Sequence, residues 1–358
     1  MKIAILAHVR QRIRQPFCGG MEAHAWHLAD GLQRRGHDVT LFASGDSDPA
    51  FRIDPVVDVH HERVFPWAEH RGSAPLIHHL DTAYAAACDR IEAGGFDVVH
   101  NNSLHRFPLE HRRTGRTPTV TSLHVPPYDA IHGFVHQSPS LRHRITVTSR
   151  RQLDAWWPAG APETVSVLHN GIDIDRWPYG PTGNGFAIWC GRITPNKGTH
   201  LAAQAAIRAG MPLTIFGAIE DPEYWEGSVA PLIGGDIRYG GHLDTVSLAA
   251  EMKRASLFVF TPCWDEPFGL VAAEAMACGL PVAAFDMGAA GEVIGNAGVL
   301  AQPGDVDGLA AAIRDAVGIP RDIPRRRVVD MFSQDLWLAR CEALYEGVCA
   351  KAHRAAAA

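Results

Sequence analysis

The chain has 358 residues, of which 46% are hydrophobic, and a formal net charge of -6 at pH 7. This length exceeds what one hydrophobic core usually serves, so two domains are expected, and the apolar fraction is large enough to build both cores. The acidic balance argues against a nucleic-acid-binding protein, which would carry a basic excess.

Targeting and redox signals indicate a cytoplasmic protein. The seven cysteines include no Cys-x-x-Cys pair, which favours free thiols in a reducing compartment over a disulfide scaffold. The opening MKIAILAHV turns polar too early for a signal peptide, and no run approaches the roughly 18 apolar residues of a membrane span. We therefore expect a soluble cytoplasmic protein without a transmembrane segment, whose oligomeric state is open.

In the first half of the chain, short apolar runs alternate with helical patterns. Such alternation is typical of βαβ units and parallel sheets. Helices are predicted at residues 21–35 and 76–91 among others, and strands at residues 3–7, 39–43, 98–99, 119–123, 145–148 and 165–168.

The second half repeats the pattern after a stretch rich in Gly and Pro. Residues 171–185 predict a linker, and strands are then predicted at residues 186–190, 213–216, 236–239, 257–260 and 282–285, with a helix at 306–316. The chain is thus expected to be of the α/β class, with two Rossmann-like domains. Because neither half carries G-x-G-x-x-G between a strand and a helix, no dinucleotide cofactor is expected.

The run DEPFGLVAAEAMACG, residues 265–279, sets two carboxylates eight residues apart around a glycine. A helix that begins near Phe268 or Gly269 would put Leu270 and Glu274 on one face and leave its first N–H groups free to bind an anion such as a diphosphate. Glu274, one turn deeper, could accept hydrogen bonds from ribose hydroxyls, and Glu266 could reach a more distal sugar. These features indicate a nucleotide-sugar site.

This run resembles the E-x7-E signature of retaining GT-B glycosyltransferases of family GT4. The resemblance rests on Glu266, residues 267–270, Glu274 and residues 279–282. It implies two Rossmann-like domains with parallel sheets facing each other across a cleft: an acceptor domain at residues 1–168 and a nucleotide-sugar domain at 169–332. A last helix, residues 333–358, would pack back on the first domain.

Two cations are predicted on one loop of the second domain. In GRITPNKG, Arg192 follows a strand and Lys197 precedes a helix, so both lie at the carboxyl edge of the sheet, where open α/β sheets bind ligands. Departure of a nucleoside diphosphate builds negative charge that fixed cations stabilise. The family resemblance assigns Arg192 and Lys197 to the donor phosphates, and Gly241 and Leu243 to the base.

The first domain carries Gly19-Gly20 before a helix predicted to begin near Met21. Two glycines let the backbone approach a phosphate and adopt positive φ, while the helix N-terminus points at the same anion. The pair resembles the G-G-x-E element of the family.

His124 ends a predicted strand at the same kind of sheet edge, and the resemblance places it beside the transferred sugar, where it would help to fix the reacting centre. Three basic side chains precede Gly19 and are predicted to border the cleft and bind the acceptor: Arg10, Arg12 and Arg14. Peripheral membrane contact through such residues is not favoured over a solvated surface.

Three D-x-D patterns raise the alternative of a metal-dependent GT-A transferase. They occur at residues 46–48, 173–175 and 305–307, but this alternative leaves the second domain and the paired glutamates unexplained. Asp305 is better interpreted as a helix N-cap. We expect no bound metal and no cofactor other than the nucleotide-sugar co-substrate.

The favoured function is therefore retaining, metal-independent transfer of a hexose from a nucleoside-diphosphate sugar, UDP-glucose or a relative, to an acceptor hydroxyl. The runs GRITPNKG and FGAIEDPEYWE further resemble a branch that includes the avilamycin-pathway transferase and UDP-glucose:tetrahydrobiopterin glucosyltransferases, which favours a small-molecule acceptor over a glycan. UDP is not separated from GDP or ADP. A GT-B-fold UDP-sugar epimerase and a non-catalytic sugar-nucleotide-binding subunit remain as alternatives.

Overall fold

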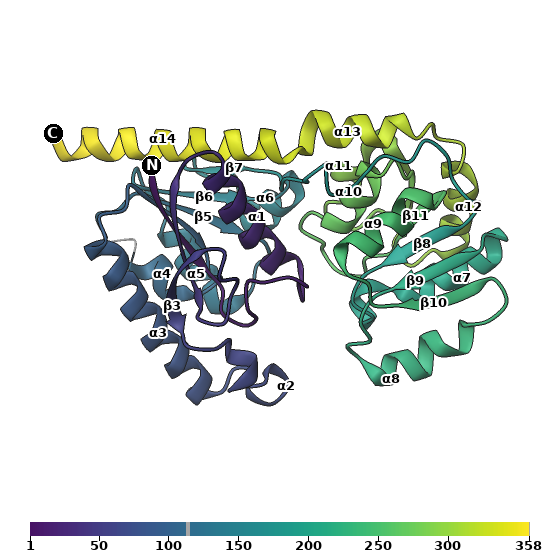
Figure 1. Cartoon of the computed structure of the whole chain (residues 1–358), viewed down its shortest axis with the longest axis horizontal. Helices are drawn as coiled ribbons and strands as arrows, with labels where there is room; N and C mark the ends of the chain where they lie inside the picture. Colours follow the sequence, from purple (N-terminus) through teal and green to yellow (C-terminus); the bar gives the residue numbers. More distant parts are fainter. Residues whose placement is uncertain (112–114, 358) are drawn as a thin grey trace. The chain divides into compact units, whose positions relative to one another are not determined.

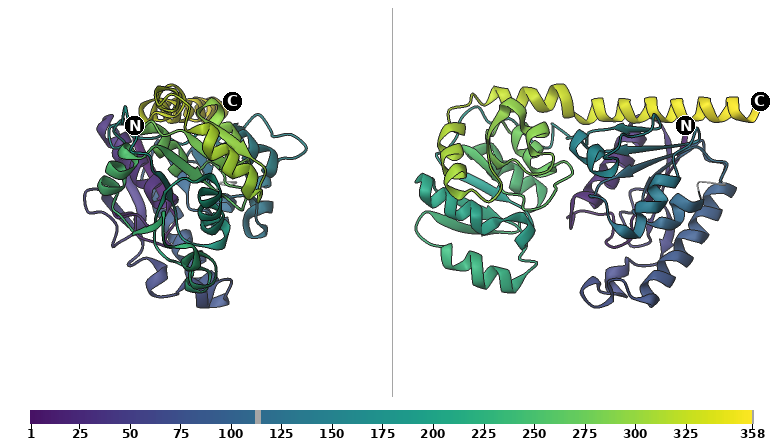
Figure 2. Two further views of the ribbon diagram at one scale, coloured as in Figure 1. Left: turned by 90° about the vertical axis from the view of Figure 1, so that its right-hand side faces the viewer. Right: turned by 180° about the vertical axis from the view of Figure 1, so that it is seen from behind.

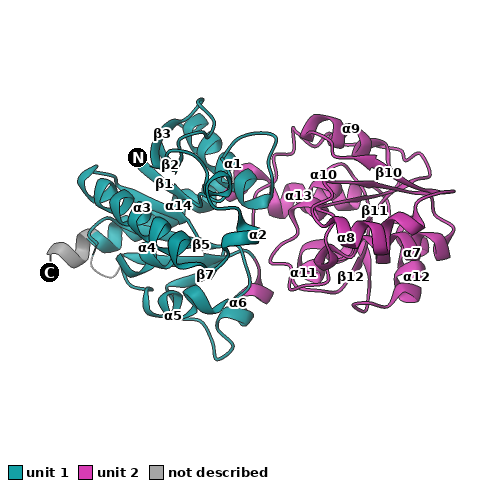
Figure 3. Ribbon diagram, turned by 90° about the horizontal axis from the view of Figure 1, so that it is seen from below, with its two compact units in different colours: residues 1–148, 153–168, 338–358 teal, residues 149–152, 169–337 magenta. Residues whose placement is uncertain are grey.

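The computed structural model describes residues 1–111 and 115–357. The chain forms two compact units, coloured separately in Figure 3. Unit 1 contains Met1–Thr148, Leu153–Leu168 and Leu338–Ala358, and unit 2 contains Ser149–Gln152 and His169–Trp337.

Unit 1 is built on a seven-stranded sheet in the order β3-β2-β1-β4-β5-β6-β7, in which all neighbouring strands are parallel. Its strands are β1 (Lys2–Ala7), β2 (Asp38–Ser44), β3 (Arg52–Val57), β4 (Val98–Asn102), β5 (Thr119–Leu123), β6 (His143–Val147) and β7 (Val165–Val167). The helices between them are α1 (Gly20–Arg34), η1 (His61–Arg63), α2 (Trp67–His70), α3 (Ala74–Ala93), α4 (Arg106–His111), α5 (Asp129–Gln137) and α6 (Arg150–Trp156).

Unit 2 is built on a six-stranded parallel sheet in the order β10-β9-β8-β11-β12-β13. Its strands are β8 (Ala187–Cys190), β9 (Leu213–Phe216), β10 (Ile237–Gly241), β11 (Leu257–Phe260), β12 (Val282–Phe285) and β13 (Gly298–Ala301). Its helices are η2 (Pro195–Lys197), α7 (Thr199–Ala209), α8 (Pro222–Tyr224), η3 (Trp225–Val229), η4 (Ala230–Leu232), α9 (Thr245–Arg254), α10 (Leu270–Ala277), α11 (Ala290–Ile294), η5 (Gly295–Ala297), α12 (Val306–Ala316) and α13 (Asp322–Phe332).

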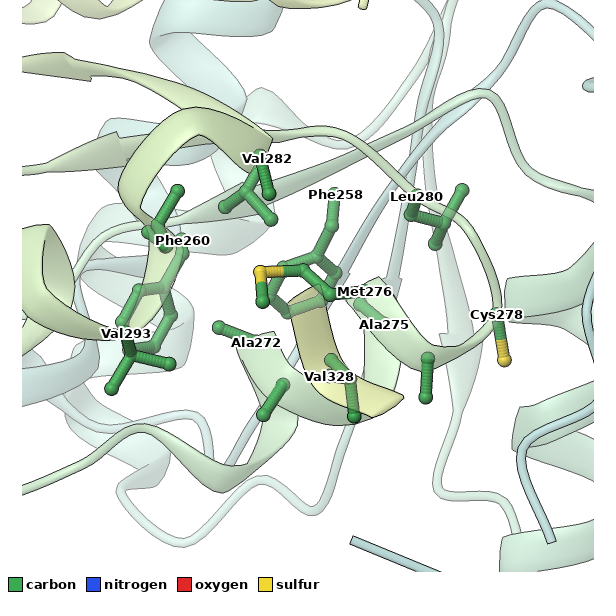
Figure 4. Packing of buried hydrophobic residues seen from close by; sticks show 14 of the residues in the cluster. Phe258, Phe260, Ala272, Ala275, Met276, Cys278, Leu280, Val282, Val293 and Val328 are labelled. Atoms are coloured by element: carbon green, nitrogen blue, oxygen red, sulfur yellow. The ribbon is translucent and has the colours of Figure 1, made fainter. Parts of the chain in front are cut away.

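Strand alternation builds a separate core on each face of the unit 2 sheet. Because successive side chains of a strand point to opposite faces, Phe258 packs with α9, α10, α11 and α13, whereas Leu257 packs with α7, α8 and α12 (Figure 1). Figure 4 shows Met276 and Ala272 of α10 packed near Phe258 and Val282. Helix α10 is therefore fixed against the centre of the sheet, close to the carboxyl ends of its strands.

The last helix, α14 (Gln334–Ala357), lies along unit 1 for most of its length (Figure 1, Figure 2). Glu342 accepts a bidentate hydrogen bond from Arg35 at 3.0 and 2.9 Å. Tyr345 is buried, and its hydroxyl oxygen lies 2.6 Å from Nδ1 of His100 in β4. A Cβ at Gly31 of α1 would meet Leu338 at 2.6 Å, so the absence of a side chain there lets the two helices approach closely.

Two strands escaped the sequence-based prediction, and both lie at sheet edges. Strand β3 contains Pro55, which has no N–H to donate and is tolerated only where one side of the strand is unpaired. Strand β13 is only partly buried over its first three residues. Strand β3 lacks the continuous apolar pattern that predicts a buried parallel strand, and β13 is a run of only four residues that begins with glycine.

One prediction about connections was wrong. Residues 171–185, predicted to be a linker, pack into unit 2: Ile172 and Trp177 are 3% and 5% exposed, and Arg325 donates to the Trp177 carbonyl at 2.9 Å. The helix predicted at residues 333–358 corresponds to α14, and Ser333, whose ψ is 145°, separates it from α13. Among the described residues, none of the helices combines the length and apolar character that a bilayer crossing requires.

Candidate functional site

The predicted donor segment forms a loop followed by a short helix at the carboxyl end of β11. The helix α10 begins at Leu270, slightly later than predicted, with Gly269 as its N-cap at φ 86°. A Cβ at Gly269 would lie 3.0 Å from the ring of Phe260, and left-handed backbone already disfavours other residues. Phe268 is 2% exposed and packs edge-on against Phe332, so it anchors the loop rather than lining an open surface.

Glu266 and Lys197 meet at the centre of this loop. Lys197 Nζ lies 2.6 Å from Glu266 Oε2, and the two side chains are only 19% and 12% exposed. The indole N–H of Trp264 donates to the same oxygen at 2.8 Å, and the Lys197 ammonium lies 5.0 Å from the centre of the Trp264 ring. The structure therefore brings together two residues that the sequence predicted, with a third, Trp264, that the prediction missed.

The backbone of Glu266 is held from the opposite side by the turn after β12. Ala289 donates its N–H to the Glu266 carbonyl at 2.8 Å. Gly288 has φ 61°, and a Cβ there would lie 2.3 Å from the Glu266 nitrogen and 2.4 Å from its oxygen. Only glycine permits this approach, so Gly288 helps to fix where the Glu266 side chain starts.

The loop that carries Lys197 is tied to the same segment. The Thr261 hydroxyl donates to the carbonyls of Lys197 and Gly198 at 2.9 and 3.0 Å, and Cys263 donates its N–H to Asn196 at 2.9 Å. Lys197 ends η2 immediately before α7. Two loops at the carboxyl ends of β8 and β11 thus act as one rigid support.

Arg192 lies on the same β8 loop but does not join the cluster around Lys197. Its guanidinium donates to Glu220 at 2.8 Å, with side chains 43% and 46% exposed. Such exposed pairs contribute little stability, so Arg192 can exchange Glu220 for an anionic ligand at small cost. Both predicted phosphate-binding cations are therefore paired with a carboxylate of their own unit.

Glu274 lies one turn into α10 and is partly exposed. Desolvation by its apolar surroundings raises its pKa to about 7. Among the described residues, no hydrogen-bond donor or cation contacts the Glu274 carboxylate. Leu270, one turn before it in α10, packs at the edge of the adjoining core. Hydrogen bonds from the hydroxyl groups of a ligand would stabilise the charged form of such a carboxylate.

The segment predicted to contact the base ends β10. Gly241 adopts φ 82° and accepts a hydrogen bond from the Gly217 N–H at 2.9 Å. Leu243 packs at the margin of the core that surrounds α10. The structure thus places both residues at the carboxyl edge of the unit 2 sheet, on the β10 side.

In unit 1, the glycine pair begins α1 as expected, and neither glycine uses the positive φ that the residue type permits. Gly19 is the N-cap with φ -166°, and Gly20 is the first helical residue. A Cβ at Gly19 would lie 3.1 Å from Glu22 Oε2, so the local need for glycine is space beside that carboxylate. Glu22 in turn lies 3.2 Å from His8, which follows β1.

His124 directly follows β5 and belongs to a group of histidines at the carboxyl edge of the unit 1 sheet. Its ring lies 4.0 Å from that of His24, and its Nε2 donates to Asn102 Oδ1 at 3.2 Å. Desolvation, with smaller contributions from His100 and His8, lowers its pKa to about 3. His124 is therefore a neutral imidazole near pH 7 and presents Nδ1 as a hydrogen-bond acceptor.

The three arginines predicted to bind an acceptor lie on the loop between β1 and α1. Arg10 donates to Glu62 at 2.9 Å and lies 4.9 Å from the centre of the Trp67 ring. Arg12 and Arg14 are exposed. Arg10 is thus committed to local contacts, while the other two present their guanidinium groups to solvent.

The D-x-D patterns have structural roles. Asp46 accepts hydrogen bonds from His60 at 3.1 and 2.6 Å, and Asp48 accepts one from Trp26 at 2.9 Å. Asp305 caps α12 by accepting from the Gly308 N–H, which confirms the N-cap interpretation. Within residues 1–111 and 115–357, no three His, Cys, Asp or Glu side chains gather as metal ligands would.

Two family descriptions match the chain. "Glycosyltransferase Family 4" matches residues 18–176 and "Glycosyl transferases group 1" matches residues 186–318. The chain belongs to the group 1 glycosyltransferases of family GT4. It is therefore a nucleotide-sugar glycosyltransferase, and its family is a retaining one.

Known members of the family resemble the chain over most of its length. The glycogen synthase of Mycobacterium tuberculosis is 28% identical, over 86% of this chain and 84% of that protein. AviGT4, a glycosyltransferase involved in avilamycin A biosynthesis, superposes with a TM-score of 0.73 at 20% identity and covers 98% of both chains. The Anabaena protein Alr3699/HepE, solved in complex with UDP-glucose, gives 0.72 at 19% identity over 97% of this chain and all of that one. These likenesses identify the GT-B fold.

Trp264 and Glu220 are the site residues that sequence reasoning overlooked. Trp264 stands two residues before Glu266, immediately before the run that carried the resemblance, and a tryptophan with a polar N–H so close to an acidic residue is the signal that could have found it. No signal linked Glu220 to Arg192, because the contact joins the loops after β8 and β9 across 28 residues of sequence.

Proposed function

We propose that this GT4 member is a retaining, metal-independent transferase that moves a hexose from UDP-glucose, or a close relative, to a hydroxyl group of a small molecule. The observation that carries this proposal is the ion pair of Lys197 with Glu266 beside the N-terminus of α10. A cation, a helix N-terminus and two glutamates, one on the loop before α10 and one inside it, match a sugar diphosphate in charge and hydrogen-bonding capacity.

Each group of unit 2 then has a role. Lys197 and Arg192 hold the diphosphate together with the first N–H groups of α10. Glu274 accepts hydrogen bonds from the ribose hydroxyls, and Glu266 accepts one from the sugar. The backbone around Gly241 and Leu243 contacts the base.

In the proposed reaction the bond between the anomeric carbon and the diphosphate oxygen breaks, and a bond to the acceptor oxygen forms on the same face of the sugar. The acceptor proton passes to the departing phosphate oxygen, so no protein nucleophile is required. Lys197 and Arg192 stabilise the charge that develops on the leaving group. In unit 1, His124 accepts a hydrogen bond from a sugar hydroxyl through Nδ1, while Gly19 and Gly20 begin a helix whose N-terminus faces an anion.

Arg12 and Arg14 are proposed to meet the acceptor, since their guanidinium groups are exposed on the loop before Gly19. The complex of Alr3699/HepE with UDP-glucose supports the choice of donor. The place of AviGT4 in the biosynthesis of avilamycin A supports a small acceptor. The similarity to a glycogen synthase supports a glycan acceptor as the alternative.

The proposal is tested first by nucleotide binding. UDP, GDP and ADP are compared by thermal shift, because a nucleotide that binds the folded chain raises its Tm by mass action. UDP-glucose is then incubated with the chain and a panel of acceptors, and the products are identified by mass spectrometry and by the anomeric configuration of the new bond. Release of UDP with an α-linked product supports the proposal.

Each alternative predicts a different result in the same experiment. Conversion of the donor to an epimer, with no transfer, would indicate an epimerase, and tight binding without turnover would indicate a binding subunit. Activity that is lost with a chelator and restored by manganese would overturn the metal-independent mechanism.

A further inference from the structure

We infer that Trp264 is a positioning residue, which orients Glu266 so that Oε1 accepts a hydroxyl of the transferred sugar. This inference rests on the proposed function, because it assigns a specific task to a residue beside the same site. The predicted donor contacts do not include Trp264.

The first argument is that two donors converge on one carboxylate oxygen. Lys197 Nζ lies 2.6 Å from Glu266 Oε2, and Trp264 Nε1 donates to the same atom at 2.8 Å. Among the described residues, none donates a hydrogen bond to Oε1. The two oxygens of Glu266 are thus distinguished: Oε2 is engaged by the protein, and Oε1 remains available as an acceptor.

The second argument concerns what happens when the diphosphate attracts Lys197. An ammonium on a flexible stem can turn toward phosphate oxygens, and Glu266 would then lose its ionic partner. The Trp264 N–H is a neutral donor on a rigid ring, so its bond to Oε2 persists after this exchange. Glu266 keeps its orientation at the moment when the sugar must be held.

The third argument is that Trp264 contacts both members of the ion pair. Its ring lies 5.0 Å from the Lys197 ammonium, within the range of a cation–π interaction, while its N–H meets Glu266. Phenylalanine would retain the first contact and lose the second. Leucine would lose both, which separates the two contributions by mutation.

The test compares Trp264→Phe and Trp264→Leu with Trp157→Phe as a matched control. Trp157 is 6% exposed in a core of unit 1, so it reports the general effect of removing an indole. Dissociation constants are measured for UDP and for UDP-glucose, and kcat and KM are measured for donor hydrolysis. UDP lacks the transferred sugar, so its affinity does not depend on a contact with Glu266 Oε1.

For Trp264→Phe we expect UDP to bind within about twofold of the unchanged protein, UDP-glucose to bind about fivefold to tenfold more weakly, and kcat to fall about tenfold. These values correspond to the net contribution of one typical hydrogen bond. Trp264→Leu should also change the affinity for UDP, because Lys197 loses its aromatic neighbour. Trp157→Phe should leave the ratio of the two dissociation constants unchanged.

A change of equal size for both nucleotides would overturn the inference, because it would indicate general damage to the loop rather than lost orientation of Glu266. Unchanged kinetics in Trp264→Phe would overturn it as well. Failure of the proposed function itself is recognised separately: the unchanged protein would then bind neither UDP nor UDP-glucose.

Discussion

Lys197 and Glu266 lie 69 positions apart in the sequence, yet their charged groups are 2.6 Å apart in a setting where both side chains are mostly buried. The cation proposed to hold the donor phosphates thus neutralises the carboxylate proposed to hold the sugar. Binding of a sugar diphosphate would offer each partner a substitute: phosphate oxygens for Lys197 and a hydroxyl for Glu266. Donor binding and rearrangement of this ion pair are therefore coupled.

Replacing Lys197 by alanine should slow transfer much more than it weakens donor binding. The ammonium stabilises charge that is largest when the diphosphate departs, and loss of one such group costs about 10²–10³-fold in kcat. The measurement is kcat and KM for UDP-glucose. Lys253→Ala, an exposed lysine of α9, is the control with the same change of charge. A rise in KM at constant kcat would contradict the proposed role, because it would indicate uniform binding of ground state and transition state.

Glu274 should make donor binding depend on pH. Its pKa of about 7 means that the carboxylate, the stronger acceptor for ribose hydroxyls, forms only as the pH rises through neutrality. The affinity for UDP should therefore increase between pH 6 and 8 and level off above that range. Titration calorimetry across this range, with Glu274→Gln for comparison, measures the effect. A glutamine variant that binds UDP as tightly as the unchanged protein at pH 8, with the same pH profile, would exclude the assignment.

Ionisation of Glu274 should lower the stability of the folded protein. Its pKa is raised on folding from the ordinary value of 4.5 to about 7, so the folded state holds its proton more tightly, and stability falls as the pH rises through this interval. Glu274→Gln should then raise the free energy of unfolding at pH 8 by at most on the order of 3 kcal/mol, with a matching rise in Tm. At pH 4 the substitution should change the Tm little. A Tm at pH 8 that falls would show that the carboxylate is stabilised by its surroundings.

The central strands and the motif loops were predictable because their signals are local. Strand β11 is a continuous apolar run and β5 is rich in β-branched residues, and both were predicted with the bounds that the structure shows. The acidic pair around α10 could be placed at the carboxyl end of a strand because the apolar run of β11 precedes it directly. Asp305 was recognisable as an N-cap from its position before an apolar helical pattern.

What could not be predicted depends on contacts between distant segments. The partner of Lys197 could not be known, because Glu266 and Glu220 both lie on loops that the sheet brings to the same edge. The packing of residues 171–185 depends on Arg325, far along the chain, so a stretch rich in Gly and Pro was interpreted as a linker. The closeness of the Glu22 carboxylate to Gly19 is a contact that composition cannot reveal.

Gly288→Ala should displace Glu266 and reduce activity. Its added Cβ would lie 2.3 Å from the Glu266 nitrogen, at a φ of 61°, so both the contact and the backbone conformation oppose the change. We expect a loss of about 1–3 kcal/mol in stability and at least a tenfold fall in kcat. Gly304→Ala is the control, since Gly304 has φ 80° with no atom within 4 Å of the added Cβ and carries only the backbone cost. Equal losses of activity in the two variants would show that the contact with Glu266 is unimportant.

Glu292 should stabilise unit 2 in a manner that acid removes. Its carboxylate accepts hydrogen bonds from the N–H groups of Arg150 and Arg151 at 2.8 and 3.3 Å and lies 2.8 Å from His169 Nε2. Burial alone would raise its pKa, but the bonds from His169 and the two N–H groups outweigh burial, and the pKa is lowered. These bonds also explain why Ser149–Gln152 belong to unit 2, although the residues on both sides belong to unit 1.

Because the pKa of Glu292 is lower in the folded state, its contribution to stability is fully present above the ordinary value of 4.5 and is lost as the pH falls through the folded value. Glu292→Gln places an amide N–H₂ against donors and should cost about 1–3 kcal/mol at pH 7, a fall in Tm of roughly 2–10 °C. The difference from the unchanged protein should shrink steadily below pH 4.5. Glu223→Gln, an exposed residue of α8, should show no such pH-dependent difference. A Glu292→Gln deficit that stays constant from pH 7 to pH 3 would mean that packing, rather than charge, holds the 149–152 segment to unit 2.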